Sequence, residues 1–170
     1  MSGETKEHGL GAAMAETALE DAERQSFDKL CEVLGVRPGV NAAIGLQPGL
    51  SDCVVWDAGY LYTGDQTGFP ADTWHFRGKL ELYNRSRAAI QRWIMRLLLA
   101  FPIAPTQGRA NDLARTGNVI ILRIAPENGS VGEISTIVVK QTEKDPGRET
   151  FYSVANFDLI FTAREREKQE

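Results

Sequence analysis

One stretch of the sequence changes its periodicity midway, and this change constrains the fold more than any other feature. The stretch spans residues 73–102 and reads TWHFRGKLELYNRSRAAIQRWIMRLLLAFP. Its first half alternates apolar and polar residues, which is typical of a strand with one buried and one solvated face. Its second half places apolar residues three and four positions apart, which is typical of an amphipathic helix. Both elements need apolar cover, so the sequence predicts a sheet with a helix packed on it.

The two periodicities assign individual side chains to faces. In the strand, the residues predicted to face the core are Trp74, Phe76, Gly78, Leu80 and Leu82, and those predicted to face solvent are His75, Arg77, Lys79, Glu81 and Tyr83. Asn84 or Ser86 can cap the helix, which ends before Pro102. The apolar stripe of the helix consists of Ile90, Trp93, Ile94, Leu97, Leu98 and Phe101, and the opposite side carries Arg85, Arg92 and Arg96.

A second amphipathic helix is predicted at residues 16–34. Its apolar face repeats at three- and four-residue steps and consists of Phe27, Leu30, Cys31 and Leu34. Gly35 follows as a typical helix stop. Two strands are then predicted, at residues 40–46 and 53–62, and Gly59 indicates a bulge or bend in the second.

The last third of the chain shows strands joined by short turns, which is the pattern of an antiparallel meander. Predicted strands lie at residues 118–125, 133–141 and 151–163, joined by turns that contain Asn-Gly and Asp-Pro-Gly. The first of these strands is almost entirely apolar, which predicts a central strand covered on both faces. The fold class expected is therefore α+β, with a single mostly antiparallel or mixed sheet and helices packed on one face.

The domain organisation follows from length and local composition. A chain of 170 residues suits one hydrophobic core, which we place at residues 14–163. Residues 1–13 are small, polar and rich in glycine, which predicts a flexible tail, and residues 164–170 form a charged tail. Loops are predicted at residues 63–71 and 103–117.

Charge and hydropathy limit the cellular compartments and the classes of partner that we expect for this protein. The net charge of −4 is not that of a strongly basic nucleic-acid binder, although local basic patches remain. The longest apolar run, around residues 94–103, is too short to span a bilayer, and the N-terminal residues lack the order of a signal peptide. We therefore expect no membrane partner and a protein made in the cytoplasm. Cys31 and Cys53 form no CxxC pair, and two buried free thiols are favoured over a disulfide.

Motifs for catalysis or cofactor binding do not occur. The sequence contains neither GxGxxG nor GxxxxGK[ST], and neither GxSxG nor HExxH. His8 lies in the predicted tail, and His75 is interpreted as a surface histidine on the solvated strand face. The carboxylates around one loop suggest a site for a hard cation only weakly, because turn aspartates explain them better; they are Asp52, Asp57, Asp65 and Asp72. No catalytic, cofactor or metal site is predicted.

Basic residues and one tryptophan are the remaining candidates for function. Arg77, Lys79, Arg85, Arg92 and Arg96 fit a solvated face, a phosphate-binding face or a contact with an acidic copy of the same protein. The acidic N-terminal helix supplies the opposite charge for the last of these. Trp56 lies beside a predicted loop, where it suggests an interface anchor.

In order and texture the chain resembles the tail terminator proteins of long-tailed bacteriophages and phage-like particles. The resemblance covers residues 15–163. It rests on the amphipathic N-terminal helix, the strand entering RGKLELYNRSRAAIQRWIMRLLLAFP and the closing antiparallel set ending ANFDLIFTA. It implies a hexameric ring that caps the head-proximal end of the tail tube, stops tube polymerisation and offers a surface to the head connector.

The implied protein is structural, with the tail-neck region of the virion as its location and DNA only as cargo passing through the ring. Under this resemblance, the hypothesis for subunit contacts is Arg77, Lys79, Arg85, Arg92 and Arg96, and for a docking loop it is Trp56, Asp65 and Phe69. The alternatives are another head–tail connector, a tail-completion or tail tube protein, a small α+β enzyme and a nucleic-acid-binding module.

Overall fold

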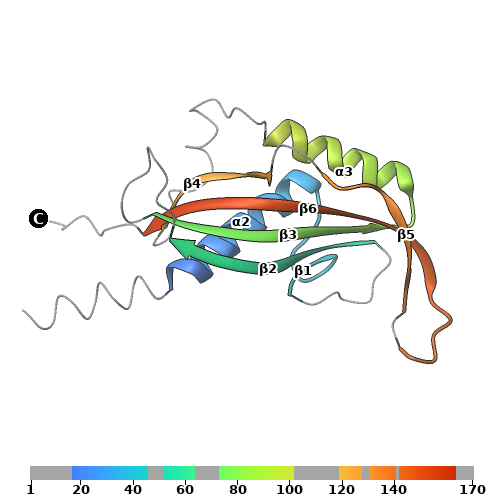
Figure 1. Cartoon of the computed structure of the whole chain (residues 1–170). Coiled ribbons are helices and arrows are strands. Elements are labelled where there is room, and N and C mark those ends of the chain that lie inside the picture. Colours follow the sequence, from blue (N-terminus) through green and yellow to red (C-terminus); the bar gives the residue numbers. More distant parts are fainter. Residues whose placement is uncertain are drawn as a thin grey trace, which may run out of the picture.

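The computed structural model describes residues 17–45, 52–63, 73–101, 119–127, 131–140 and 142–163. These residues form one sheet with helices against one of its faces (Figure 1). The elements in chain order are α2 (Ala18–Leu34), β1 (Ala42–Ile44), β2 (Cys53–Thr63), β3 (Thr73–Asn84), α3 (Arg87–Ala100), β4 (Val119–Pro126), β5 (Ser135–Val139) and β6 (Arg148–Ala163). The predicted α+β class is confirmed. The predicted tails at residues 1–13 and 164–170, and residues 64–71 and 103–117 of the predicted loops, lie outside the described ranges.

The sheet is mixed, with the strand order β1-β2-β3-β6-β4. β1 pairs with β2 in parallel, and every other pairing is antiparallel. β3 occupies one edge of β6 along nearly its whole length, so β4 and β5 share the other edge in succession. β3 ends opposite Phe151, and the β5–β6 hairpin continues beyond that point as a two-stranded arm (Figure 1).

The predicted meander is wrong in one connection. β4 and β5 both pair with β6 instead of with each other, and β4 lies at the end of the strand order instead of in the middle. An apolar run signals burial, and an edge strand that packs under a helix needs the same composition. Ile124 of β4 belongs to the core cluster that also contains the buried face of α2. The Asp-Pro-Gly turn is confirmed, because β5 and β6 form the hairpin around it and Asp145 Oδ1 accepts a hydrogen bond from the Gly147 amide at 2.9 Å.

α2 forms because its apolar residues recur on one side and a glycine stops it. The four residues predicted for its inner face are all buried: Phe27, Leu30, Cys31 and Leu34. Gly35 adopts a left-handed conformation with φ of 73°, which glycine reaches without steric cost. The Val36 amide then donates to the Cys31 carbonyl at 3.0 Å, so one of the last carbonyls of the helix is satisfied. The helix begins two residues later than predicted.

α3 has a defined start and a predicted inner stripe. Ser86 is the N-cap, and its Oγ accepts a hydrogen bond from the Ala89 amide at 3.3 Å. Asn84 instead supports the turn, since its Oδ1 accepts from the Ser86 amide at 2.9 Å. Within the predicted stripe Ile90, Leu97 and Phe101 are buried, and Trp93, Ile94 and Leu98 are half-buried.

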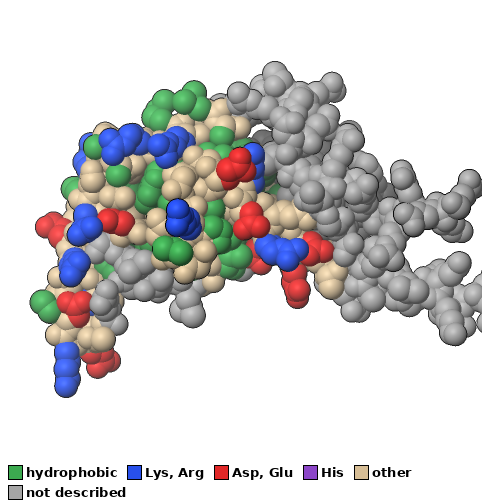
Figure 2. All heavy atoms as spheres, turned by 180° about the vertical axis from the view of Figure 1, so that it is seen from behind, with side chains coloured by type: hydrophobic (Ala, Val, Ile, Leu, Met, Phe, Trp, Pro, Cys, Tyr) green, Lys and Arg blue, Asp and Glu red, His purple; other side chains and the backbone are tan. Residues whose placement is uncertain are grey.

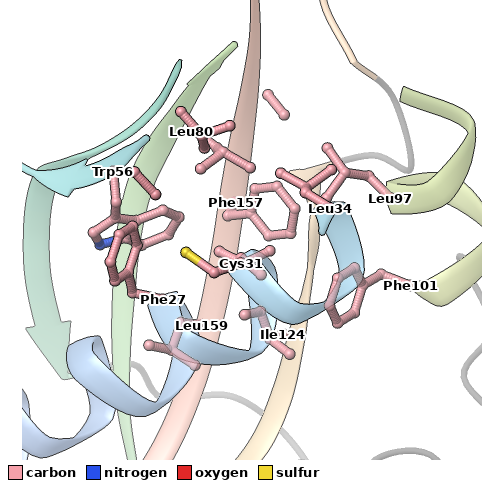
Figure 3. Close-up of a cluster of buried hydrophobic side chains, with 14 of the residues drawn as sticks. Phe27, Cys31, Leu34, Trp56, Leu80, Leu97, Phe101, Ile124, Phe157 and Leu159 are labelled. Atoms are coloured by element: carbon pink, nitrogen blue, oxygen red, sulfur yellow. The ribbon is translucent and has the colours of Figure 1, made fainter. Parts of the chain in front are cut away.

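The core lies between the sheet and the two helices (Figure 3). The predicted inward face of β3 is confirmed, with Phe76, Leu80 and Leu82 at most 3% exposed. The bulge predicted at Gly59 is also confirmed, because the β2–β3 register shifts between Asp57 and Tyr60.

The opposite sheet face is only partly solvated, and this corrects the prediction that His75 and Tyr83 face solvent, because both are buried. His75 points to that face but is fully buried, with its Nδ1 4.0 Å from an Asp158 carboxylate oxygen. Strand periodicity gives the face of a side chain and not its depth, and His75 lies on β3 between strands on both sides. The same face carries a small second core of Cys53, Val55 and Tyr83.

Candidate functional site

Three of the five basic residues predicted to contact another subunit already form ion pairs within the chain. Arg77 Nη1 lies 3.4 Å from a Glu127 carboxylate oxygen, on the sheet face away from the helices. Lys79 Nζ lies between two carboxylates, 3.2 Å from Asp57 and 3.3 Å from Glu81. Hydrogen bonds from Lys79 to Asp57 and Glu81 raise the pKa of its ammonium group. This ion-pair ladder gives the open sheet face an alternation of charges instead of a positive surface.

Two tyrosines lie beside these ion pairs on the same sheet face. The Tyr152 hydroxyl donates to a Glu81 carboxylate oxygen at 3.1 Å. Burial, followed by the charge of Glu81, raises the pKa of Tyr152 to about 12. The pKa of Tyr83 is raised for the same two reasons, and the two tyrosine rings lie 5.0 Å apart between centroids. These contacts join β3 to β6 across this face of the sheet.

Arg85 holds the turn between β3 and α3. Its Nη2 lies 2.9 Å from an Asp52 carboxylate oxygen, and its backbone amide donates to the other oxygen at 2.8 Å. Burial alone would raise the pKa of Asp52, but the hydrogen bonds and charge of Arg85 outweigh it and lower that pKa. The contact joins the residue before β2 to the turn between β3 and α3.

Arg92 and Arg96 lie together and differ from the first three. Arg96 Nη1 donates to the Leu34 carbonyl at 2.8 Å, which satisfies a carbonyl at the C-terminus of α2. Arg92 is exposed, and no hydrogen bond or ion pair joins its side chain to another residue that the structure describes. Both arginines line a pocket of about 250 Å³ between the end of α2, the end of β3 and α3. The other polar or aromatic lining residues are Asn41, Asn84 and Trp93.

The outer side of α3 combines positive charge with exposed apolar side chains. The helix carries three arginines and no acidic residue: Arg87, Arg92 and Arg96. Met95 and Leu99 are 54% and 66% exposed, one helical turn apart on this outer side. Large apolar side chains that share a helix face with cations are typical of an interface.

α2 has the opposite charge. It carries five acidic and two basic residues, against three basic and no acidic residues on α3. Seen from the helix side, Lys and Arg side chains line the upper left edge where α3 lies, and acidic side chains are interspersed with basic ones nearer α2 (Figure 2). The helix layer is thus negative along α2 and positive along α3.

The prediction that Trp56 anchors a docking loop is wrong. Trp56 is fully buried, and its ring lies 6.0 Å from those of Phe76 and Phe157 between centroids (Figure 3). Its Nε1 donates to a Glu23 carboxylate oxygen on α2 at 3.1 Å. An aromatic residue near a loop can anchor an interface or a core, and here the strand face decides for the core because Trp56 shares it with Leu80. Asp65 and Phe69, the other two docking residues, lie outside the described residues.

The aspartates and cysteines that the structure describes do not come together in one site. Asp52 and Asp57 belong to separate ion pairs, and Asp72 lies outside the described ranges. In the part of the chain that the structure describes, no three His, Cys, Asp or Glu side chains are grouped so as to hold a metal ion. Neither Cys31 nor Cys53 forms a disulfide bond and both are buried, and burial raises the pKa of the Cys31 thiol to about 12.

The pocket is the feature that the sequence did not reveal. Arg92 and Arg96 were candidates because of their charge, but Asn41 comes from a distant segment that only the packing of α2 against α3 brings beside them. Neither α2 nor α3, the helices within the described ranges, has the length and apolar character of a membrane-spanning helix. Neither a protein-family model nor a curated protein sequence matches this chain.

Proposed function

We propose that this protein is a structural ring subunit of a phage-type tail. As a tail terminator it caps the head-proximal end of the tail tube, ends tube polymerisation and forms the surface that joins tail to head. Its partners are copies of itself, the tail tube protein and a head connector or neck protein. It acts in the tail-neck region of the virion after assembly in the host cytoplasm, and DNA only passes through the ring.

The separation of charge between the two helices carries this proposal. A surface with a negative and a positive region is complementary to the same surface on a second copy of the chain, so the charge separation supports contacts between copies. Head-to-tail contacts between identical subunits close into rings when the rotation per subunit allows it. The exposed Met95 and Leu99 beside the arginines add apolar area to the same contact.

The order of helices and strands supports the proposal that this ring subunit is a tail terminator. An N-terminal amphipathic helix, a strand that leads directly into a second helix and a closing antiparallel set are the elements on which the resemblance rests, and α2, β3, α3 and the β4–β6 strands supply them. The β5–β6 arm extends past the end of β3, which gives such a subunit a second surface that reaches beyond its own core.

Mass photometry and negative-stain electron microscopy of the purified chain test the proposal. We expect closed rings with a mass near six times that of the chain. Filaments would favour a tail tube protein, and a monomer at micromolar concentration would refute a ring subunit. A salt-dependent shift assay with DNA tests the nucleic-acid alternative, and we expect no specific complex at low salt.

A further inference from the structure

The pocket beside α3 has the composition of a carboxylate-binding site. Two guanidinium groups and two side-chain amides line it, and no acidic residue does. A guanidinium carries five N–H donors, and the bond from Arg96 to the Leu34 carbonyl uses only one of them. Arg92 adds a second guanidinium that has no partner among the residues described. Paired arginines with free donors favour a planar oxyanion, which they bind with two parallel hydrogen bonds.

The local backbone charges also favour an anion. The pocket lies at the C-terminus of α2, whose carbonyls contribute a partial negative charge, but Arg96 is bonded there and offsets it. Ala89, in the first turn of α3, lines the other side, and the N-terminal end of a helix carries partial positive charge. Arg92 is then a full charge that no carboxylate among the described lining residues offsets, so this lining is positive.

We infer that this pocket receives a carboxylate side chain from α2 of a second copy of the chain, and that Glu20 is the group that enters it. The inference rests on the proposed ring function, since it specifies the contact between neighbouring subunits. Among the acidic residues in the N-terminal half of α2, Glu20 is the exposed one. Asp21 is bonded to Arg24, and Glu23 accepts the hydrogen bond of the buried Trp56.

The position of Glu20 fits a contact between copies and not within one chain. Glu20 is in the first turn of α2, whereas the pocket lies at the last residue of the same helix. A helix of this length separates its two ends by about 25 Å at 1.5 Å per residue, so Glu20 cannot reach the pocket of its own subunit. A head-to-tail neighbour can bring the two ends together.

Substitutions at the two sites test the inference. Arg92→Gln should raise the concentration at which the assembly dissociates in mass photometry by about tenfold or more, because it leaves a carboxylate at the interface without its cation. Arg87→Gln is the matched control on the same helix, since Arg87 is exposed and does not line the pocket. We expect it to weaken the assembly clearly less than Arg92→Gln does, because it lowers the positive charge of α3 without removing a cation from the pocket. Arg92 has no bond within the described chain, so thermal melting should show that Arg92→Gln folds normally.

Charge reversal identifies the entering carboxylate. Glu20→Arg and Arg92→Glu should each weaken the assembly, and the double variant should restore it, because each interface then contains the pair in reversed order. The same reversal at exposed Asp28 or Glu32 should give no rescue. An assembly that resists Arg92→Gln, or a double variant that does not recover, overturns the pocket contact while the ring proposal stands. A wild-type chain that stays monomeric overturns both.

Discussion

Gly78 lies in the middle of β3 beside the indole ring of Trp56, and we expect Gly78→Ala to destabilise the fold. A Cβ atom built at this position would lie 2.7 Å from Cζ2 and 3.0 Å from Cη2 of Trp56, and 3.2 Å from the Asp57 carbonyl oxygen. The first two distances are far below normal van der Waals contact. The ring cannot easily yield, because Trp56 is fully buried and is bonded to Glu23.

The expected magnitude is the difference of two opposing effects. Overpacking a well-packed core costs about 1–3 kcal/mol. Alanine is also preferred over glycine within a strand by roughly 0.5–1 kcal/mol, since it loses less backbone entropy on folding. The tight contact places the overpacking cost near the upper end of its range, so the net loss should be about 2 kcal/mol in the free energy of unfolding.

Urea unfolding followed by far-ultraviolet circular dichroism measures this loss. Trp56→Phe provides the control, because phenylalanine lacks the part of the indole ring that the new Cβ would meet. In a double-mutant cycle Gly78→Ala should become neutral or slightly stabilising in the Trp56→Phe background, which gives a coupling energy of about 2–3 kcal/mol. A Gly78→Ala variant as stable as the wild type, or one equally destabilised in both backgrounds, would refute the packing argument.

Three further predictions concern single contacts. Ser86→Ala removes the N-cap of α3 and should lower the free energy of unfolding by about 1 kcal/mol in the same urea assay. Burial raises the pKa of Glu23 despite the hydrogen bond that Trp56 donates to it, so the folded state loses stability as pH rises through the raised pKa of Glu23. Glu23→Gln keeps an acceptor for Trp56 without the charge, and it should raise the urea midpoint at neutral pH. The raised pKa of Tyr152 contributes stability that is complete below pH 10 and lost as pH rises towards about 12; Tyr152→Phe should flatten that alkaline decline.

The buried face of β3 and the end of α2 could be predicted because both follow from short-range signals in the sequence. The alternation of β3 placed Phe76, Leu80 and Leu82 correctly, and the stop at Gly35 ended α2 at the predicted residue. Such features depend on residues within one or two turns of each other. The depth of His75 and the edge position of β4 were predicted wrongly because both depend on which strands lie alongside, and alternation does not encode that.

The candidate site was predictable only in part. Charge alone pointed to Arg92 and Arg96 along with three other basic residues, and only the structure separates them from the three that are paired with Glu127, Asp57 and Asp52. The pocket depends on how α2 and α3 are placed relative to each other, and β1, β2 and β3 lie between these two helices in the sequence. A tryptophan next to a loop gave an interface signal that the buried Trp56 does not support.

The pairing of β6 also sets the order in which the protein can be assembled during synthesis. β6 follows every other described strand in the sequence, yet β3, β4 and β5 all take their hydrogen bonds from it. Until β6 leaves the ribosome, each of those strands presents an unpaired edge, and such edges pair readily with other chains. β1, β2 and β3 can pair before then, but β3 joins β6 late, across about eighty residues of sequence, so chains interrupted before β6 should aggregate through these open edges.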